Sequence, residues 1–116
     1  MKAKIDEGIH LFNSQKYFET HEVLEEVWLK TEGEKKIFLH GLIQVAAAFH
    51  HHTKGNAVGF RSLLEKGLKK LESFGDDEEG IDLAGLRLQL EPWRTRAAHP
   101  TVDSKHPPLP RIHRKR

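Results

Sequence analysis

The segment from residue 34 to residue 53 constrains the fold most strongly, because as a helix it is apolar on nearly every side. A helix of this kind is stable in water when other elements cover it, so the segment predicts the central helix of a bundle. One narrow strip interrupts the pattern. His40, Gln44 and His51 follow spacings of four and seven residues and lie on one side of the helix, with small Ala47 in the gap.

The helix expected just before it, over about residues 17 to 30, also carries polar groups on its apolar side. At ~100° per residue, His21 and Glu25 fall inside the core-facing stripe rather than on the solvated back. The apolar members of that stripe are Tyr17, Phe18, Leu24 and Trp28. Because a buried charge needs a partner, we expect His21 and Glu25 to face the strip on the central helix. The two helices would then be adjacent and antiparallel, with a shared polar seam.

Three further helices are expected, and no strand is convincing. The first covers about residues 4 to 12. Asn56 is a suitable N-cap for the fourth helix and Asp82 for the fifth, whose leucine stripe we expect Pro92 to end. Short connections favour antiparallel neighbours. The sequence thus predicts an all-α, compact antiparallel bundle or array of four to five helices over residues 1–98, followed by an extended basic, proline-containing tail over residues 99–116.

The charge divides between these two parts. Residues 105 to 116 contain five Lys or Arg and no acid, whereas residues 1 to 104 contain 14 basic and 17 acidic side chains. No aromatic residues interleave with the basic ones for base stacking, so nucleic-acid binding is not favoured. The run Pro107-Pro108-Leu109-Pro110 is either a polyproline ligand for another protein or a segment that packs back on the bundle. Leu109 and Ile112 favour packing back.

The composition bears on location and on metal chemistry. No segment is long and uncharged enough to span a membrane, and the first residues lack the apolar stretch of a secretion signal. A cytoplasmic location is therefore expected, without a membrane partner. The chain has no cysteine, so any metal would be held by nitrogen and oxygen ligands.

Several separated motifs resemble one family. They are Phe12-Asn13, Tyr17-Phe18-Glu19, His21-Glu22-Val23-Leu24-Glu25, Trp28, Gly41-Leu42-Ile43-Gln44, Phe49 with His51, and Gly55-Asn56. In this order, over about residues 5 to 74, they resemble the domain of unknown function 309 family. The resemblance implies a compact all-helical fold, cytoplasmic bacterial or archaeal proteins, and the label of predicted metal-dependent hydrolase. Gln15 stands where that family commonly has a glycine.

The metal hypothesis follows from helical spacing. His21 and Glu25, four residues apart, can reach one ion from a single helix face, as the two histidines do in the motif His-Glu-x-x-His. Glu22 then takes the position of the general base, and His51 is the candidate third ligand from the facing helix. Zn²⁺, Mn²⁺ or Fe²⁺ would suit these ligands, and a small molecule would be the substrate.

A structural hypothesis explains the same residues. Glu25 accepts a hydrogen bond from a histidine and Gln44 closes a satisfied polar network without an ion. Tyr17 and Trp28 are then core or rim aromatics instead of binding residues. Under this hypothesis the protein is a non-enzymatic helical binding or scaffold module, and the residues leave the choice between module and enzyme open.

Overall fold

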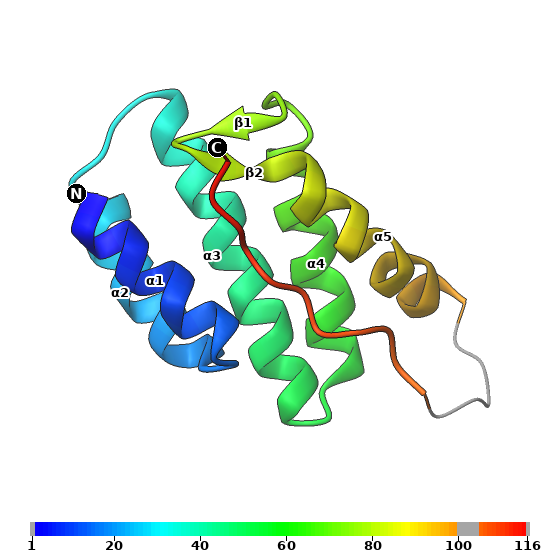
Figure 1. Ribbon diagram of the computed structural model, residues 1–116. Coiled ribbons are helices and arrows are strands. Elements are labelled where there is room, and N and C mark those ends of the chain that lie inside the picture. The colour runs from blue at the N-terminus through cyan, green and yellow to red at the C-terminus, as the bar shows by residue number, and fades with distance from the viewer. Residues whose placement is uncertain (1, 100–104, 116) are drawn as a thin grey trace.

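The computed structural model describes residues 2–99 and 105–115, and these form an all-α fold as predicted (Figure 1). The helices are α1 (Lys2–Asn13), α2 (Tyr17–Leu29), α3 (Glu34–Thr53), α4 (Ala57–Leu71) and α5 (Leu83–Ala98). A small antiparallel hairpin of two-residue strands, β1 (Asp77–Glu78) and β2 (Ile81–Asp82), was not predicted. It lies in the acidic turn before α5. No described helix has the length and apolar character that crossing a membrane requires.

Successive helices run antiparallel. Near one end of the pair α2 and α3, the ring centroids of Phe18 and His50 are 5.3 Å apart, and near the other end those of Trp28 and His40 are 5.3 Å apart. The beginning of each helix therefore meets the end of the other, which confirms the predicted pairing. Helices α4 and α5 pair in the same sense, because Phe60 contacts Trp93 at one end while Arg87 bonds the carbonyl of Leu71 at the other.

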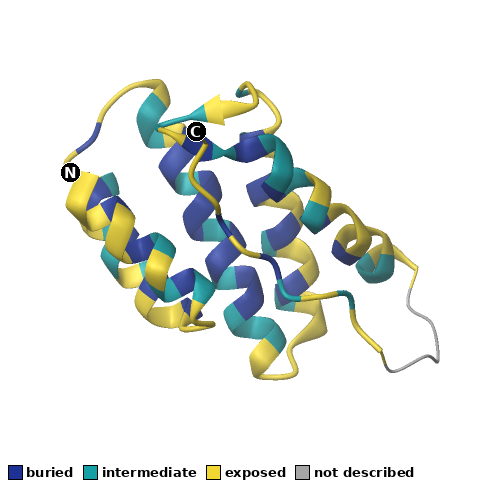
Figure 2. Ribbon diagram, viewed as in Figure 1, coloured by how far each residue is buried: buried dark blue, intermediate teal, exposed yellow. Residues whose placement is uncertain are grey.

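Helix α3 lies at the centre of the array, as its apolar circumference predicts (Figure 2). Nine of its 20 residues are buried. It packs between α2 and α4. Its buried large side chains are Phe38, Leu39, Leu42, Ile43, Val45 and Phe49. The residues of α3 that are less buried, among them His40, Gln44 and His52, mark the directions in which the helix approaches the surface.

Two glycines set the distance between α3 and α4. A β-carbon on Gly67 of α4 would lie 2.9 Å from the carbonyl oxygen of Gly41 in α3, closer than real β-carbons approach. A β-carbon on Gly41 would meet the side chain of Leu71 at 2.9 Å. The two backbones are therefore in near contact, and the loss of helix propensity at each glycine, ~1 kcal/mol, is offset by the packing that this approach allows.

Helix α5 continues through Pro92 to Ala98, so the predicted end at the proline is wrong. Proline removes one N–H and displaces the carbonyl four residues earlier. That residue, Leu88, is 74% exposed, so the carbonyl lies on the side of the helix that faces solvent. On the inner side, buried Trp93 donates from Nε1 to the carbonyl of Pro108 at 3.0 Å and anchors the next turn.

The described part of the tail, residues 105–115, is extended and crosses the helices (Figure 1). The side-chain amide of Asn13 pairs with the backbone of Ile112, donating to its carbonyl at 2.9 Å and accepting from its N–H at 2.7 Å. Gln89 pairs with the backbone of Arg111 in the same way, at 2.9 and 2.8 Å. Ile112 is buried and Leu109 packs against the core. The segment folds back on the bundle, the alternative that these two aliphatic residues favour.

We predict that Gly67→Ala destabilises the protein although alanine favours helices. Overpacking of this kind costs about 1 to 3 kcal/mol, against a propensity gain of ~1 kcal/mol, so a net loss on the order of 1 to 2 kcal/mol is expected in urea unfolding. Gly75→Ala is the matched control, because nothing lies within 4 Å of a β-carbon there. Equal midpoints for the two variants would contradict the close approach.

Candidate functional site

A groove on the side of the array brings most of the predicted seam together. It has a volume of about 190 Å³ and lies between α2, α3 and α4. Its lining residues are His21, Glu25, Trp28, His40, Ile43, Gln44, Ala47 and Leu63. We call it the seam groove. Four of the predicted site residues, namely His21, Glu25, Trp28 and Gln44, lie in it.

His21 and Glu25 lie at the edge of the core rather than inside it, which corrects the predicted burial. Their side chains are 33% and 47% exposed, and His21 Nε2 lies 3.5 Å from Glu25 Oε2. The inward stripe of α2 is formed by other residues, namely Tyr17, Thr20, Leu24 and Val27. An ion pair that water reaches contributes less than about 1 kcal/mol. His21 Nδ1, by contrast, is buried and has no hydrogen-bond partner among the described residues.

His40 closes the groove at the end of α2. Its ring packs on Trp28 with centroids 5.3 Å apart, and the ammonium group of Lys36 lies 4.5 Å from the centroid of Trp28. Burial lowers the pKa of His40 below its ordinary value, and the positive charge of Lys70 adds to this effect. The surroundings of His40 therefore favour its neutral form over its charged form.

Gln44 is engaged with α4 rather than with His21 or Glu25. Its Oε1 accepts a hydrogen bond of 2.9 Å from Lys70 Nζ. The polar groups of the seam groove thus pair off along its length: His21 with Glu25, His40 with Trp28, and Gln44 with Lys70. The contacts link α2, α3 and α4, and they do not converge on one point.

His51 does not line the seam groove. Its Nδ1 accepts a hydrogen bond of 3.1 Å from the side-chain amide of Asn56, whose Oδ1 in turn accepts from the N–H of Gly59 at 2.9 Å. Asn56 is therefore the N-cap of α4, as predicted, and its hydrogen bond to His51 holds the capping side chain in place. Because His51 follows Gln44 by seven residues, it lies past the end of the groove, next to the turn between α3 and α4.

The two remaining predicted site residues lie elsewhere on α2. Tyr17 is buried in an aromatic cluster, with its ring centroid 5.4 Å from that of Phe12 and 5.6 Å from that of Phe49. Burial raises the pKa of its hydroxyl, which has no hydrogen-bond partner among the described residues. Glu22 is exposed on the outside of the helix. Tyr17 is a core residue in this fold, and the role of Glu22 as a base stays a prediction.

The donors for a metal ion are sparse. Among residues 2–99 and 105–115, no three His, Cys, Asp or Glu side chains are grouped so that they could hold one ion. His21 and Glu25 form a pair of donors, whereas protein metal sites usually take three or more. The assignment of His21, Glu25 and His51 as ligands stays a prediction.

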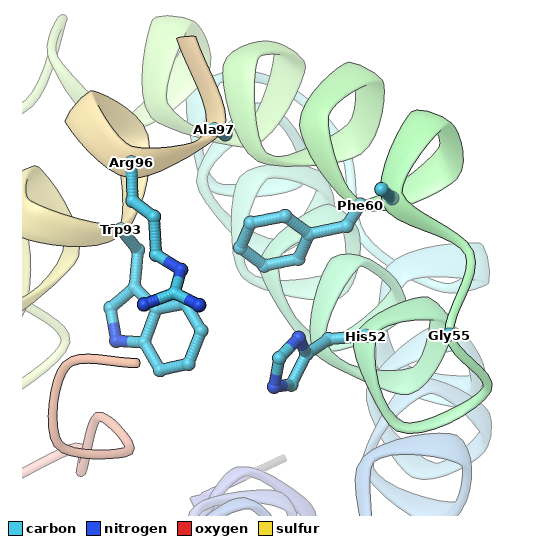
Figure 3. Close-up of a pocket in the computed structure, with 7 residues that line it drawn as sticks. His52, Gly55, Phe60, Trp93, Arg96 and Ala97 are labelled. Carbon is cyan, nitrogen blue, oxygen red and sulfur yellow. The ribbon is translucent and has the colours of Figure 1, made fainter. Parts of the chain in front are cut away.

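A second, larger cavity lies on the other side of α3, and the sequence analysis missed it. Its volume is about 320 Å³, and it is lined by His52, Gly55, Ala57, Phe60, Trp93, Arg96 and Ala97. We call it the α5 pocket. In Figure 3, the aromatic rings of Phe60 and Trp93 and the side chain of Arg96 border the cavity, and His52 faces them from α3. Three of these residues, Trp93, Arg96 and Ala97, follow Pro92, where the fifth helix was expected to end.

Comparison with known proteins places the chain in a family. The family model described as "Domain of unknown function (DUF309)" matches residues 5–63, about half of the chain. The chain belongs to the DUF309 family. The matched region spans α1 to the first half of α4, so it contains the seam groove, while the α5 pocket lies partly outside it.

Two relatives of this DUF309 domain are similar over three quarters of the chain. The uncharacterized protein YpuF of Bacillus subtilis (strain 168) is 36% identical over 88 residues, which are 75% of this chain and 51% of that protein. An uncharacterized protein of Aquifex aeolicus (strain VF5) is 33% identical over 89 residues, 75% of this chain and 26% of that protein. The chain therefore spans about half the length of the first relative and about a quarter of the length of the second.

We predict that His52 makes the stability of the protein depend on pH. Burial lowers its pKa below the ordinary value of 6.5, and the positive charges of His106 and Arg96 lower it further. The folded state thus binds this proton more weakly than the unfolded state. The contribution of neutral His52 to the free energy of unfolding is therefore complete above pH 6.5. It is lost as the pH falls through the pKa of His52 in the folded state.

Urea unfolding at pH 7.5 and pH 5 measures the effect. His52→Gln should lose less stability than the wild type between these two pH values, and a His10→Gln control, at an exposed position of α1, should behave as the wild type. An unchanged pH dependence in His52→Gln would show that this side chain is not the cause.

Proposed function

We propose that this DUF309 domain is a non-enzymatic helical binding module. In this proposal the seam groove is a structural network that fixes α2, α3 and α4 in register. The binding surface is the outer face of α2, formed by Phe18, Glu22, Glu25 and Leu29 and flanked by the exposed Glu19. Its partner is a basic amphipathic segment of another protein. The proposal depends on this outer face, because exposed apolar side chains lie there beside glutamates, and α2 has no lysine or arginine to neutralise them.

The spacing of these residues forms one stripe. Phe18, Glu22, Glu25 and Leu29 are separated by four, three and four residues, so they share one side of the helix. Phe18 is 49% and Leu29 65% exposed, and they stand roughly 16 Å apart at 1.5 Å per residue. Two exposed apolar anchors with acids between them match the apolar and basic positions of an amphipathic helix lying alongside.

The charge of α2 supports a basic partner. The helix contains four glutamates and no lysine or arginine. Glu26 pairs with Lys4, and Glu25 lies beside His21. Glu19 and Glu22 form no ion pair within the described part of the chain. A cationic segment would neutralise these acids and would be guided to them by long-range attraction.

The pairing of the seam groups supports a structural role for the groove. Gln44 is occupied by Lys70, and His51 by Asn56, so neither is free to join His21 and Glu25 without losing a hydrogen bond. The length of the relatives is also consistent with a module, because the matched region forms about half of one relative and about a quarter of the other.

A synthetic amphipathic peptide of leucine and lysine tests the binding surface. We expect it to shift the NMR amide signals of α2, with an affinity that falls as salt rises. Glu19→Gln with Glu22→Gln should weaken binding roughly tenfold, the equivalent of about 1.4 kcal/mol. A leucine and glutamate peptide should not bind.

The matched control is Glu72→Gln with Asp77→Asn, which removes the same charge from exposed positions outside α2. This variant should bind the basic peptide as the wild type does. Equal weakening in both double variants would show that net charge alone attracts the peptide, and signal shifts outside α2 would place the binding surface elsewhere.

The metal-dependent hydrolase is the second candidate, and one observation favours it. His21 Nε2 and Glu25 Oε2 are 3.5 Å apart, and both residues line the seam groove. A divalent ion held there would supply an activated water as nucleophile. His21, Glu25 and His51 would be its ligands and Glu22 the base, which requires His51 to leave Asn56.

Metal titration separates the two candidates. If an ion binds the folded state, added Zn²⁺ or Mn²⁺ raises the thermal midpoint with concentration, and the rise fades at lower pH as protons compete for the ligands. The rise should vanish in a His21→Ala, His51→Ala double variant and persist in a His10→Ala, His113→Ala control. We expect a flat titration for the untagged wild type, and a rise that follows this pattern would replace the proposed module by a metal site.

A further inference from the structure

The α5 pocket has aromatic walls. The ring centroid of His52 lies 4.9 Å from that of Trp93 and 5.6 Å from that of Phe60, and Phe60 and Trp93 are 5.7 Å apart. Its volume of about 320 Å³ is at the lower end of the range for sites that hold small organic molecules. The walls in Figure 3 therefore suit a ligand with a single flat ring.

One side of the pocket carries a cation that forms an ion pair with no acid among the described residues. Arg96 donates one hydrogen bond from its guanidinium group, to the carbonyl of Lys105, and forms no ion pair with any acid in the described residues. The nearby acids Glu65 and Glu91 pair with Arg94 instead. A guanidinium group has five N–H donors, so Arg96 retains donors for a carboxylate.

The opposite rim is also electropositive. Ala57, which lines the pocket, is the first residue of α4, where backbone N–H groups have no acceptor within the helix. The side chain of Asn56 accepts from the N–H of Gly59, two residues further into the helix. Gly55, with φ of +74°, makes the tight turn that brings this helix end to the rim.

The tail completes the surroundings. The ring of His106 stacks on Trp93 with centroids 5.1 Å apart and stands edge-on to His52 at 5.5 Å. An aromatic lining by itself also suits a cationic ligand. Here Arg96, and His106 when it is protonated, repel a cation and attract an anion, so charge decides between the two.

We propose that the α5 pocket binds a small organic anion, a carboxylate attached to one flat ring. The ring packs against the wall that Phe60, Trp93 and His52 form together, and the carboxylate meets the guanidinium group of Arg96. This site is independent of the outer face of α2 and of the seam groove, so its test can fail without affecting the proposed module.

Benzoate is the probe, with benzamide as its neutral analogue and benzylamine as its cationic analogue. The chain has two tryptophans, Trp93 in the α5 pocket and Trp28 in the seam groove, and their indole N–H signals report the two sites separately. We expect benzoate to shift the Trp93 signal in a saturable way and leave Trp28 unchanged. Benzamide should bind more weakly, and benzylamine should not bind.

Arg96→Gln should weaken benzoate binding roughly tenfold or more, because the charge-assisted hydrogen bond is lost. Arg94→Gln is the matched control on the same helix, at an exposed residue that does not line the pocket. Benzoate should also raise the pKa of His52, followed by NMR, in the wild type and not in Arg96→Gln.

Three results would overturn the proposal. They are no saturable Trp93 shift up to the solubility limit of benzoate, equal binding of benzylamine, and equal weakening by the Arg94 and Arg96 variants. Amide spectra of both variants establish that they are folded, so a loss of binding in Arg96→Gln reports on the pocket.

Discussion

The contact between the backbones of α3 and α4 is the constraint on which the other features depend. Gly41 and Gly67 let these helices approach until a carbonyl of one lies where a side chain of the other would stand. Helix α3 is thereby enclosed, with α2 on its other flank. Its polar residues can then reach solvent in few directions, and the seam groove and the α5 pocket form where they do.

Local and periodic signals in the sequence were enough to predict how the helices are arranged. The apolar circumference of residues 34 to 53 predicts a central helix, and Asn56 and Asp82 cap the helices that they were expected to cap. These signals work because capping depends on a hydrogen bond three residues away and burial on a repeat of 3.6 residues. The antiparallel pairing of α2 and α3 followed from the short connection and the matching polar strips.

The site was less predictable, because its geometry depends on contacts between distant segments. Periodicity placed His21 and Glu25 on the core side of α2 and could not distinguish the middle of that side from its edge. His51 matched the strip by spacing but lies past the end of the groove, where Asn56 engages it. Pro92 would end an isolated helix, yet Trp93 and its bond to Pro108 sustain this one. No local pattern in the sequence predicts the hydrogen bond between Trp93 and Pro108.

The pairing of Asn13 and Gln89 with the tail has a consequence for the order in which the molecule is assembled. Asn13 bonds a residue 99 positions further along the chain, whereas α2, α3 and α4 contact their neighbours in sequence. During synthesis the central helices can therefore pack while the last segment is still inside the ribosome. The α5 pocket gains its Trp93–Pro108 bond and its His106 neighbour after that segment emerges. The seam groove can thus form early in translation, whereas the α5 pocket is completed only after His106 and Pro108 have emerged.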